Sequence, residues 1–371
     1  MPPFAPQSSA PSSAIAGALA AVTDAVTSAL GARLAALLLV GSYARGEGGV
    51  VERRGALHPY NDFDLVAVVR GGGRGLRSRL AAIGHAWTAR LGVDVDIYPV
   101  GAPALASPPP TLFWLDVALG GVRVLAGDER LLDAVRRLRP RDVPLEEAAR
   151  LLANRAVGLA LSNLERAPAD RTRPQRHVHK AALAVGDALL LAADRYQPTV
   201  AARAEALRGL AGAPRVGPAL VARYEDAARF RLRPERWAPP AGEPLDLWLA
   251  AAVADLGRRH LAFERLRAGA PSDVAAFAAW SGRLYPRLSD VRPGGALLAS
   301  LRAAARAEAP LLPWTGHPRE RLARVAVALA YGGADPRARR EAERLLGTPG
   351  ANPGGDERLR RALGSLLLVG G

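Results

Sequence analysis

The distribution of short apolar runs limits the possible folds of this chain more than any other feature. Four runs have the length of β-strands and lie in the N-terminal part of the chain, at 33–41, 62–69, 93–100 and 122–127. The third of them alternates apolar and polar residues, which is the pattern of a half-buried strand. Apolar residues spaced by three and four predict helices over 14–31 and 76–91. The N-terminal part is therefore expected to contain a sheet with helices packed on it.

Helical periodicity dominates the rest of the chain, from Pro144 onward. Proline and glycine punctuate it, and the predicted helices lie at 145–166, 175–195, 199–210, 216–231, 245–267, 272–283, 295–308, 319–331, 335–346 and 356–368. The fold class expected from this order is α+β. We predict a disordered lead-in at 1–13, a sheet-containing domain at 14–140 and a helical domain at 141–371, with a further subdivision near 280–320.

The composition excludes several kinds of site and partner. The 371 residues include no cysteine, so disulfides, thiolate zinc sites and cysteine nucleophiles are excluded. The formal charge is +15, but the arginines are scattered, and solvated helix faces explain them better than a nucleic-acid groove does. The N-terminus lacks the pattern of a signal peptide, and no apolar run reaches the roughly 18 to 20 residues that span a bilayer. We expect a cytoplasmic protein without a membrane partner.

Two aspartates open the second predicted strand. Asp62 and Asp64 are two residues apart, so their side chains leave the strand from the same face. Carboxylates this close repel each other unless a cation or a proton lies between them. A strand cap would explain Asp62, but it would not explain Asp64, which stands inside an apolar run where an unpaired charge is costly.

The third predicted strand repeats this arrangement with Asp94 and Asp96. If the second and third strands are neighbours in one sheet, three or four carboxylates converge on one patch. Carboxylate oxygens suit Mg²⁺, which proteins hold with a few carboxylates together with the phosphates of a substrate. A pair of such ions is a common device for displacement at phosphorus. The pattern therefore favours a nucleoside triphosphate as substrate.

Gly41 and Ser42 end the first predicted strand. A strand that turns into a helix at Gly-Ser lets the backbone approach a phosphate closely, and it points N–H groups and a hydroxyl at that phosphate. Arg45, three residues after Ser42, can place its positively charged guanidinium against the same phosphate. We therefore assign Gly41, Ser42 and Arg45 to triphosphate binding.

Together these residues resemble the nucleotidyltransferase superfamily typified by DNA polymerase beta and kanamycin nucleotidyltransferase. The resemblance covers about the first 130 residues, and the pieces that carry it are Gly41-Ser42, Arg45-Gly46, Asp62-Phe63-Asp64 with the apolar run after it, and Val95-Asp96-Ile97. It implies a mixed-sheet domain in which Asp62 and Asp64 bind the metal ions and Asp96 is the third carboxylate of the metal site. In this family the third carboxylate helps to deprotonate the acceptor hydroxyl, and the Gly-Ser turn clamps the triphosphate.

Two features differ from the family pattern or stay open. The spacer between Ser42 and Asp62 is longer than usual, and the additional segment at 48–60 is either a lid or a substrate contact. Asp94 and Asp96 share a strand face, so either one can be the third carboxylate. We prefer Asp96, because a strand segment of this kind followed by a loop matches the family better. Asp94 is then a neighbour that supports it.

Lys180, on the predicted helix at 175–195, is a further candidate for nucleotide binding. It is the only lysine among 50 basic residues. Where arginine has replaced almost every lysine, the remaining one can mark a place that needs a compact ammonium group. Lys180 and Asp187 are seven residues apart and share a helix face. A triphosphate contact and a chance surface lysine explain Lys180 equally well.

The expected function is Mg²⁺-dependent transfer of a nucleoside monophosphate from a nucleoside triphosphate to an acceptor hydroxyl, with release of pyrophosphate. A small molecule such as an aminoglycoside or another sugar is the first candidate for the acceptor, because a helical partner domain suits it. The alternatives are a macromolecular acceptor, either the 3′ end of a tRNA or a protein side chain, and a nucleotide-binding regulator without turnover.

Overall fold

The computed structural model describes residues 13–53, 55–73, 75–164, 172–213, 215–240, 242–287, 317–347, 356–357 and 359–363. Contacts within the chain divide it into two units. Unit 1 comprises Met1–Val143, Ala193–Ala211 and Glu225–Trp237, and unit 2 comprises Pro144–Ala192, Gly212–Tyr224 and Ala238–Gly371. Two segments that the sequence analysis placed in the helical domain are thus grouped with the sheet. We call Ala193–Ala211 and Glu225–Trp237 the return segments.

Some of the predicted features lie outside the described residues. The lead-in at 1–13 is described only at Ser13, where the first helix begins. The helix predicted at 295–308 falls outside the described residues altogether, and so does most of the subdivision expected near 280–320. Those two features stay predictions.

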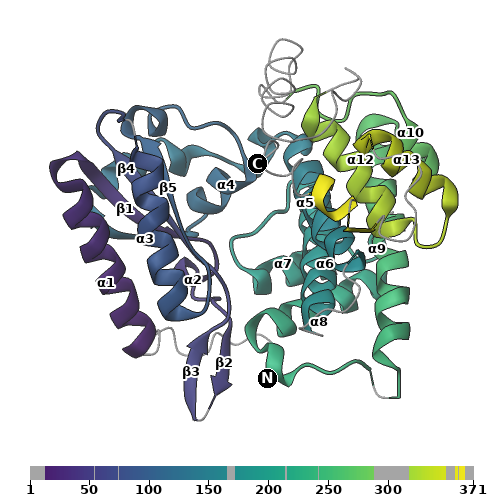
Figure 1. Ribbon diagram of the computed structural model, residues 1–371, viewed down its shortest axis with the longest axis horizontal. Coiled ribbons are helices and arrows are strands. Elements are labelled where there is room, and N and C mark those ends of the chain that lie inside the picture. Colours follow the sequence, from purple (N-terminus) through teal and green to yellow (C-terminus); the bar gives the residue numbers. More distant parts are fainter. Residues whose placement is uncertain are drawn as a thin grey trace. The chain divides into compact units, whose positions relative to one another are not determined.

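Unit 1 contains a four-stranded mixed sheet. Its strands are β1 (Leu34–Val40), β4 (Phe63–Val69), β5 (Val95–Gly101) and β6 (Val122–Gly127), in the order β5-β4-β1-β6. β1 is antiparallel to both of its neighbours, whereas β4 and β5 are parallel. The four predicted strands and the α+β class are confirmed (Figure 1). A separate hairpin of β2 (Val50–Arg53) and β3 (Ala56–Pro59) was not predicted.

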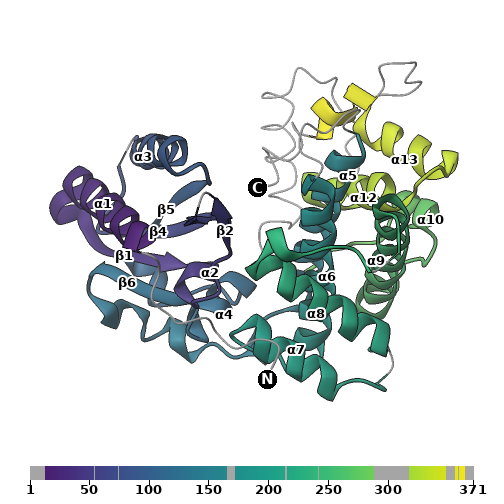
Figure 2. The same cartoon turned by 90° about the horizontal axis from the view of Figure 1, so that it is seen from below.

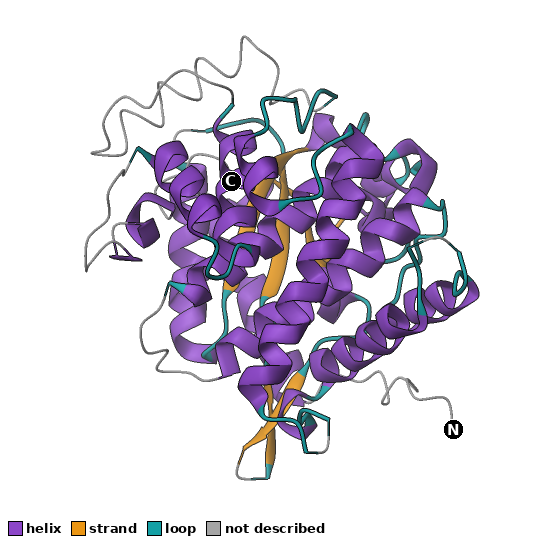
Figure 3. Ribbon diagram, turned by 90° about the vertical axis from the view of Figure 1, so that its right-hand side faces the viewer, coloured by secondary structure: helices purple, strands orange, loops and turns teal. Residues whose placement is uncertain are grey.

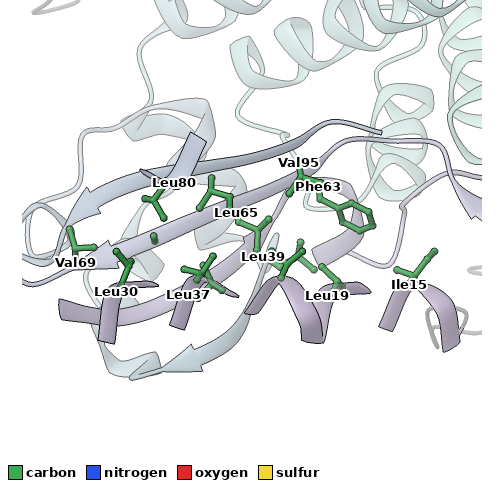
Figure 4. Close-up of a cluster of buried hydrophobic side chains, with 14 residues drawn as sticks. Ile15, Leu19, Leu30, Leu37, Leu39, Phe63, Leu65, Val69, Leu80 and Val95 are labelled. Carbon is green, nitrogen blue, oxygen red and sulfur yellow. The ribbon is translucent and has the colours of Figure 1, made fainter. Parts of the chain in front are cut away.

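Helices cover both faces of the sheet (Figure 2). α1 (Ser13–Leu30) and α3 (Leu76–Leu91) pack on one face, and α4 (Leu112–Ala118) packs on the other together with short 3-10 turns. Figure 4 shows the first of these cores, in which side chains of α1 meet those of β1 and β4. Because both faces of β1 are covered, nearly all of this strand is buried, and its sequence is apolar without interruption.

α1 corrects one expectation from the sequence. The segment Ile15–Arg33 has a mean hydropathy of 1.5 and is long and apolar enough, by composition, to cross a membrane. Its most buried side chains nevertheless form a single stripe that packs on the sheet, at Ile15, Leu19, Val22, Val26 and Leu30. This is the packing of an amphipathic helix whose apolar stripe faces a sheet. A cytoplasmic location stays a prediction.

Unit 2 is helical (Figure 3). Its main helices are α5 (Leu145–Asn163), α6 (Thr172–Ala192), α9 (Leu245–Ala268), α10 (Val274–Ala279), α12 (Pro318–Tyr331) and α13 (Pro336–Leu346). α5 packs against α6 and α12, and α6 also packs against α9. Side chains of Asp273, His317 and Asp335 accept hydrogen bonds from the first turns of α10, α12 and α13, which fixes where these helices begin. The corresponding predicted helices are confirmed, although α10 ends earlier than expected.

The first return segment contains α7 (Val200–Gly209), and the second contains the C-terminal half of α8 (Pro218–Leu232). The division between the units thus falls within α8. The short helix α2 (Gly41–Ala44) follows β1 directly. The 3-10 turns lie at Gly31–Arg33, Ala102–Leu105, Glu129–Leu132, Val135–Arg137, Pro140–Asp142 and Pro234–Arg236.

Candidate active site

The strand directions bring three chain segments together at one end of the sheet. Because β1 runs antiparallel to β4, the C-terminal end of β1 lies beside the N-terminal end of β4, and Val40 is paired with Asp64. Because β4 and β5 are parallel, their N-terminal ends lie side by side, and Asp64 is paired with Asp96. The Gly41-Ser42 turn, the Asp62–Asp64 segment and the start of β5 therefore meet at this end.

Asp64 and Asp96 lie on the same face of the sheet, because paired residues of neighbouring strands point to the same side. Farther along this face, Val66 and Val68 belong to the core under α4. The apolar part of the face is buried, whereas Asp64 is half-buried and Asp96 is exposed. The carboxylates thus occupy the open end of a face that is otherwise covered.

The carboxylates influence one another electrostatically. Although Asp96 is exposed as a residue, its pKa is raised, first by partial desolvation of the carboxyl group and then by the negative charges of Asp94 and Asp62. A hydrogen bond from Tyr98 and the positive charge of His85 act in the opposite direction. Asp94, Asp62 and Asp96 thus lie close enough for their charges to interact, and carboxylates in such proximity disfavour one another's ionised form.

Asp96 fits the role of third carboxylate better than Asp94 does. Asp96 is in register with Asp64, whereas Asp94 precedes β5 and its backbone carbonyl accepts a hydrogen bond from Phe63 N at 2.8 Å. That hydrogen bond ties the start of β4 to the start of β5. Asp94 thus contributes charge to the cluster, and its backbone helps to hold the two strand ends together.

Gly41 allows the first segment to approach the aspartates. Its φ is +74°, and a methyl group at this position would lie 3.1 Å from Asp64 Oδ2. Both the left-handed backbone and the short distance therefore require glycine. Ser42, which follows it, is buried at 7% exposure. The turn predicted from Gly-Ser is present, and it lies against one of the predicted metal ligands.

Tyr98 belongs to the site and was missed in the sequence analysis. It is two residues after Asp96 on β5, so it lies on the same face, and its side chain is 46% exposed. Burial of its hydroxyl and the negative charges of Asp96, Asp64 and Asp62 raise the pKa of Tyr98 to about 12. The hydroxyl therefore stays protonated and donates a hydrogen bond to Asp96. The two-residue spacing from Asp96 could have identified it.

Arg45, which the sequence analysis assigned to triphosphate binding, has two carboxylate partners, and a contact with a phosphate stays a prediction. Its Nε lies 3.3 Å from Glu47 Oε2, its Nη1 lies 3.2 Å from Asp116 Oδ2, and its side chain is 5% exposed. The guanidinium of Arg45 is thus bound by the carboxylates of Glu47 and Asp116. The sequence analysis considered neither Glu47 nor Asp116.

The segment at 48–60 forms the β2–β3 hairpin, and its base is tied to the aspartate segment. Gly49 N donates to Asn61 Oδ1 at 2.5 Å, and Tyr60 N donates to Gly49 O at 2.9 Å. The Tyr43 hydroxyl donates to Gly49 O at 2.9 Å, and the Tyr43 ring stacks on Phe63 at 4.4 Å. These contacts fix Asn61 and Phe63, the two neighbours of Asp62 in the chain.

Lys180 lies on α6, in unit 2, and is half-buried. Asp187, on the same helix, is buried, and its Oδ1 accepts a hydrogen bond from the Tyr224 hydroxyl at 2.7 Å. This contact explains Asp187 as part of the packing of unit 2. A role of Lys180 in nucleotide binding stays a prediction.

The donors present fit a hard divalent cation whose coordination is completed by its substrate. Asp62, Asp64 and Asp96 offer carboxylate oxygens at one end of the sheet, and oxygen is the donor that Mg²⁺ prefers. Within the described part of the chain, no three His, Asp or Glu side chains are grouped closely enough to hold a metal by themselves. Mg²⁺ is usually bound through one or two carboxylates plus phosphate oxygens, so this open arrangement is compatible with it.

Comparison with known proteins adds no relative: neither the models of protein families nor the curated protein sequences produced a match. The functional argument therefore depends on the site itself.

Proposed function

We propose that this protein is a Mg²⁺-dependent nucleotidyltransferase that moves a nucleoside monophosphate from a nucleoside triphosphate to an acceptor hydroxyl. The observation that supports the proposal most is the pairing of Asp64 with Asp96 on adjacent parallel strands, next to a Gly41 backbone that approaches the Asp64 carboxylate. A nucleotidyltransferase fold, which the resemblance of these motifs implies, is part of the same proposal.

The residues of the site divide into two groups with different roles in this reaction. Gly41 and Ser42 present the turn to the triphosphate. Asp62, Asp64 and Asp96 would hold Mg²⁺, expected as a pair of ions, which would neutralise phosphate charge. Asp96 also accepts the proton of the acceptor hydroxyl as the acceptor oxygen bonds to the α-phosphorus. The bond from that phosphorus to the β-phosphate oxygen breaks at the same time, and pyrophosphate leaves.

Thermal unfolding in the presence of each nucleoside triphosphate, with and without Mg²⁺, tests the binding step. At a ligand concentration 100 times Kd, a specific ligand stabilises the folded state by about 2.7 kcal/mol. We expect this stabilisation to require Mg²⁺ and to be lost in Asp62→Asn and Asp64→Asn. Asp133→Asn is the matched control, because it removes one exposed carboxylate elsewhere in unit 1.

Pyrophosphate release with candidate acceptors tests turnover. Loss of a proton acceptor typically lowers the rate by about 10² to 10⁴-fold, and this is the loss expected for Asp96→Asn. Small hydroxyl compounds are the first acceptors to test, and transfer of labelled nucleotide to total tRNA or to protein would identify a macromolecular acceptor instead. Stabilisation by the triphosphate that persists in Asp62→Asn and Asp64→Asn would contradict the enzyme and favour a nucleotide-binding regulator.

A further inference from the structure

Asp116, at the C-terminal part of α4, lies between two arginines that come from distant parts of unit 1. Its Oδ2 is 3.2 Å from Arg45 Nη1, and its Oδ1 is 2.7 Å from Arg203 Nη2. The Tyr196 hydroxyl donates to the same Oδ1 at 2.9 Å. Both guanidinium groups are nearly inaccessible, at 5% and 4% side-chain exposure. One carboxylate thus joins the loop after β1 to the first return segment.

Further contacts strengthen this connection. Glu47, which also binds Arg45, accepts a hydrogen bond from Val200 N at 2.7 Å through its other oxygen. Arg203 Nε donates to Gln197 O at 2.6 Å, and the Arg203 guanidinium lies 4.1 Å from the centre of the Tyr196 ring. Two arginines and two carboxylates balance their charges here. A buried arrangement of this kind is sensitive to the loss of any one partner.

The Gly41-Ser42 turn depends on such support because it has little stability of its own. α2 spans only Gly41–Ala44, and a single helical turn is unfavourable in isolation. Arg45 N donates to Gly41 O and Glu47 N donates to Ser42 O, at 3.3 and 2.9 Å. The residues that close the turn through the backbone are thus the same residues whose side chains reach Asp116 and Val200.

Space for this arrangement is provided by Gly121. A methyl group there would lie 2.6 Å from the Asp116 carbonyl oxygen and 3.2 Å from Arg45 Nη1. Gly121 N donates to the same carbonyl at 2.8 Å, which closes the end of α4. The end of α4 is therefore shaped to let the Arg45 guanidinium enter beside Asp116.

We propose that Asp116 and Arg203 are positioning residues for nucleotide binding: they hold Arg45 and Glu47, and through these two residues they hold the Gly41-Ser42 turn in the form that receives the triphosphate. The inference rests on the proposed function. It assigns to the first return segment, which no sequence motif marks, a part in the affinity for the triphosphate.

The experiment compares Asp116→Ala, Arg203→Lys and a control, Leu132→Ala, in the full chain. Leu132 is fully buried in the core on the same side of the sheet, so its truncation destabilises unit 1 without touching the turn. Nucleoside triphosphate affinity is measured with Mg²⁺ by calorimetry, and KM and kcat are measured by pyrophosphate release. Hydrogen–deuterium exchange is followed in 38–50 and 194–206 without any nucleotide.

The expected result is selective for the triphosphate. Asp116→Ala should raise Kd and KM for the triphosphate by about tenfold, which corresponds to about 1.4 kcal/mol and is the order of one hydrogen bond lost between the turn and the triphosphate, while kcat changes less than KM does. Exchange should become faster in both segments. Arg203→Lys keeps the positive charge but loses the planar guanidinium with its several hydrogen-bond donors, so it should have a smaller effect of the same kind. Leu132→Ala should lower Tm and leave triphosphate affinity unchanged.

Two outcomes would overturn the inference. In the first, Asp116→Ala lowers Tm as Leu132→Ala does but leaves Kd and KM for the triphosphate unchanged, so the network is only structural. In the second, exchange in 38–50 stays as slow as in the wild type. If the wild-type protein binds no nucleoside triphosphate, the proposed function fails, and the exchange measurement still decides whether Asp116 holds the turn. If Asp116→Ala does not fold, Arg203→Lys provides the same comparisons.

Discussion

At the scale of single residues, the candidate site depends both on the polar groups that side chains provide and on positions where no side chain would fit. Gly41 has no side chain, and this absence lets the backbone lie against the Asp64 carboxylate. Arg45, assigned to the triphosphate from its position in the sequence, also binds two carboxylates in the structure. A residue type therefore indicates a set of possible roles, and its neighbours select one of them.

Gly41→Ala tests the close approach to Asp64. Alanine at a φ of +74° is strained, and its methyl group would lie 3.1 Å from Asp64 Oδ2. Gly71→Ala is the matched control, because Gly71 has a φ of +76° with nothing near its Cβ position. Both variants should lose about 1–2 kcal/mol of stability from the backbone, measured by urea unfolding. Only Gly41→Ala should lose stabilisation by nucleoside triphosphate and Mg²⁺; equal behaviour of the two variants would contradict the assignment.

Asp96→Asn tests the crowding of charge in the absence of divalent cations. The pKa of Asp96 is raised by burial and by Asp94 and Asp62, so the ionised carboxylate opposes folding at neutral pH. A raised folded-state pKa on an acid means that stability is lost as the pH rises through that pKa. We expect Asp96→Asn to unfold at the same urea concentration as the wild type or at a higher one, with a gain of at most about 0.5 kcal/mol. A clear loss of stability would show that Asp96 has a structural role instead.

At the scale of elements, the directions of β1, β4 and β5 decide which residues meet. Parallel pairing of β4 with β5 places Asp64 beside Asp96, and antiparallel pairing with β1 brings Gly41 to the same end. The strands themselves follow from their apolar sequences. The β2–β3 hairpin does not, because its strands have four residues each and mix apolar with polar side chains. Its base depends on Tyr43.

Tyr43→Phe tests how the hairpin base is held. The Tyr43 hydroxyl donates to Gly49 O and accepts from Tyr60 N at 3.2 Å, while the ring stacks on Phe63. Phenylalanine keeps the stacking and loses both hydrogen bonds. We expect a loss of about 1 kcal/mol and faster hydrogen–deuterium exchange at 49–60, with exchange in β1 unchanged. Unchanged exchange at 49–60 would show that the hairpin is held by other contacts.

His260→Gln tests an acid-sensitive position on α9. Burial and the charge of Arg267 lower the pKa of His260 to about 3, although Glu264 Oε1 lies 4.0 Å from its Nε2. Since the folded pKa lies below the ordinary value, the neutral ring contributes stability that is lost as the pH falls from about 6.5 toward 3, by up to about 1.4 kcal/mol per pH unit. Urea unfolding between pH 4 and 7 should show a steeper loss in the wild type than in His260→Gln. Equal slopes would show that the buried ring does not resist protonation.

At the scale of the whole molecule, unit 1 is not a continuous stretch of chain. It includes two return segments that follow the first helices of unit 2 in sequence. The first provides Tyr196 and Arg203 for Asp116, and the second provides Phe230, whose ring meets that of Tyr60 edge-on at 6.4 Å. Both return segments thus pack beside the loop that connects Ser42 with Asp62.

A fragment comprising residues 1–143 should therefore fold poorly. Without the return segments, Asp116 and Glu47 lose Arg203, Tyr196 and the Val200 N–H. Removing one partner of a fully buried ion pair costs about 3–5 kcal/mol. Asp116 is 27% exposed, so we expect a smaller loss here, which still matters for a marginally stable domain. A chain that joins 13–143 to 193–237 by a flexible linker is the control. Circular dichroism should show a cooperative melt at higher temperature for the linked chain, and equal melts would contradict this role of the return segments.

Local sequence was sufficient to predict most of the helices and strands, because periodic burial at spacings of two or three to four residues is written into each segment separately. It also singled out Asp62, Asp64, Asp96, Gly41 and Ser42, because charges inside an apolar strand and glycine at its end are unusual by themselves. The structure brings their segments to one end of the sheet, and their roles stay predictions. Arg45 was assigned to triphosphate binding before its contacts with Glu47 and Asp116 were known. Tyr98 was missed because an exposed tyrosine is ordinary until its neighbours are known.

Tertiary structure alone decided the contacts between segments that are far apart along the chain. Asp116 and Arg203 are 87 residues apart, and nothing near either one indicates the other. The same is true of the β2–β3 hairpin and of the return segments, whose places depend on contacts with residues far away in the sequence. Periodicity reports which face of an element is buried, but it carries no information about the partner that buries it, since any complementary surface would satisfy the same pattern.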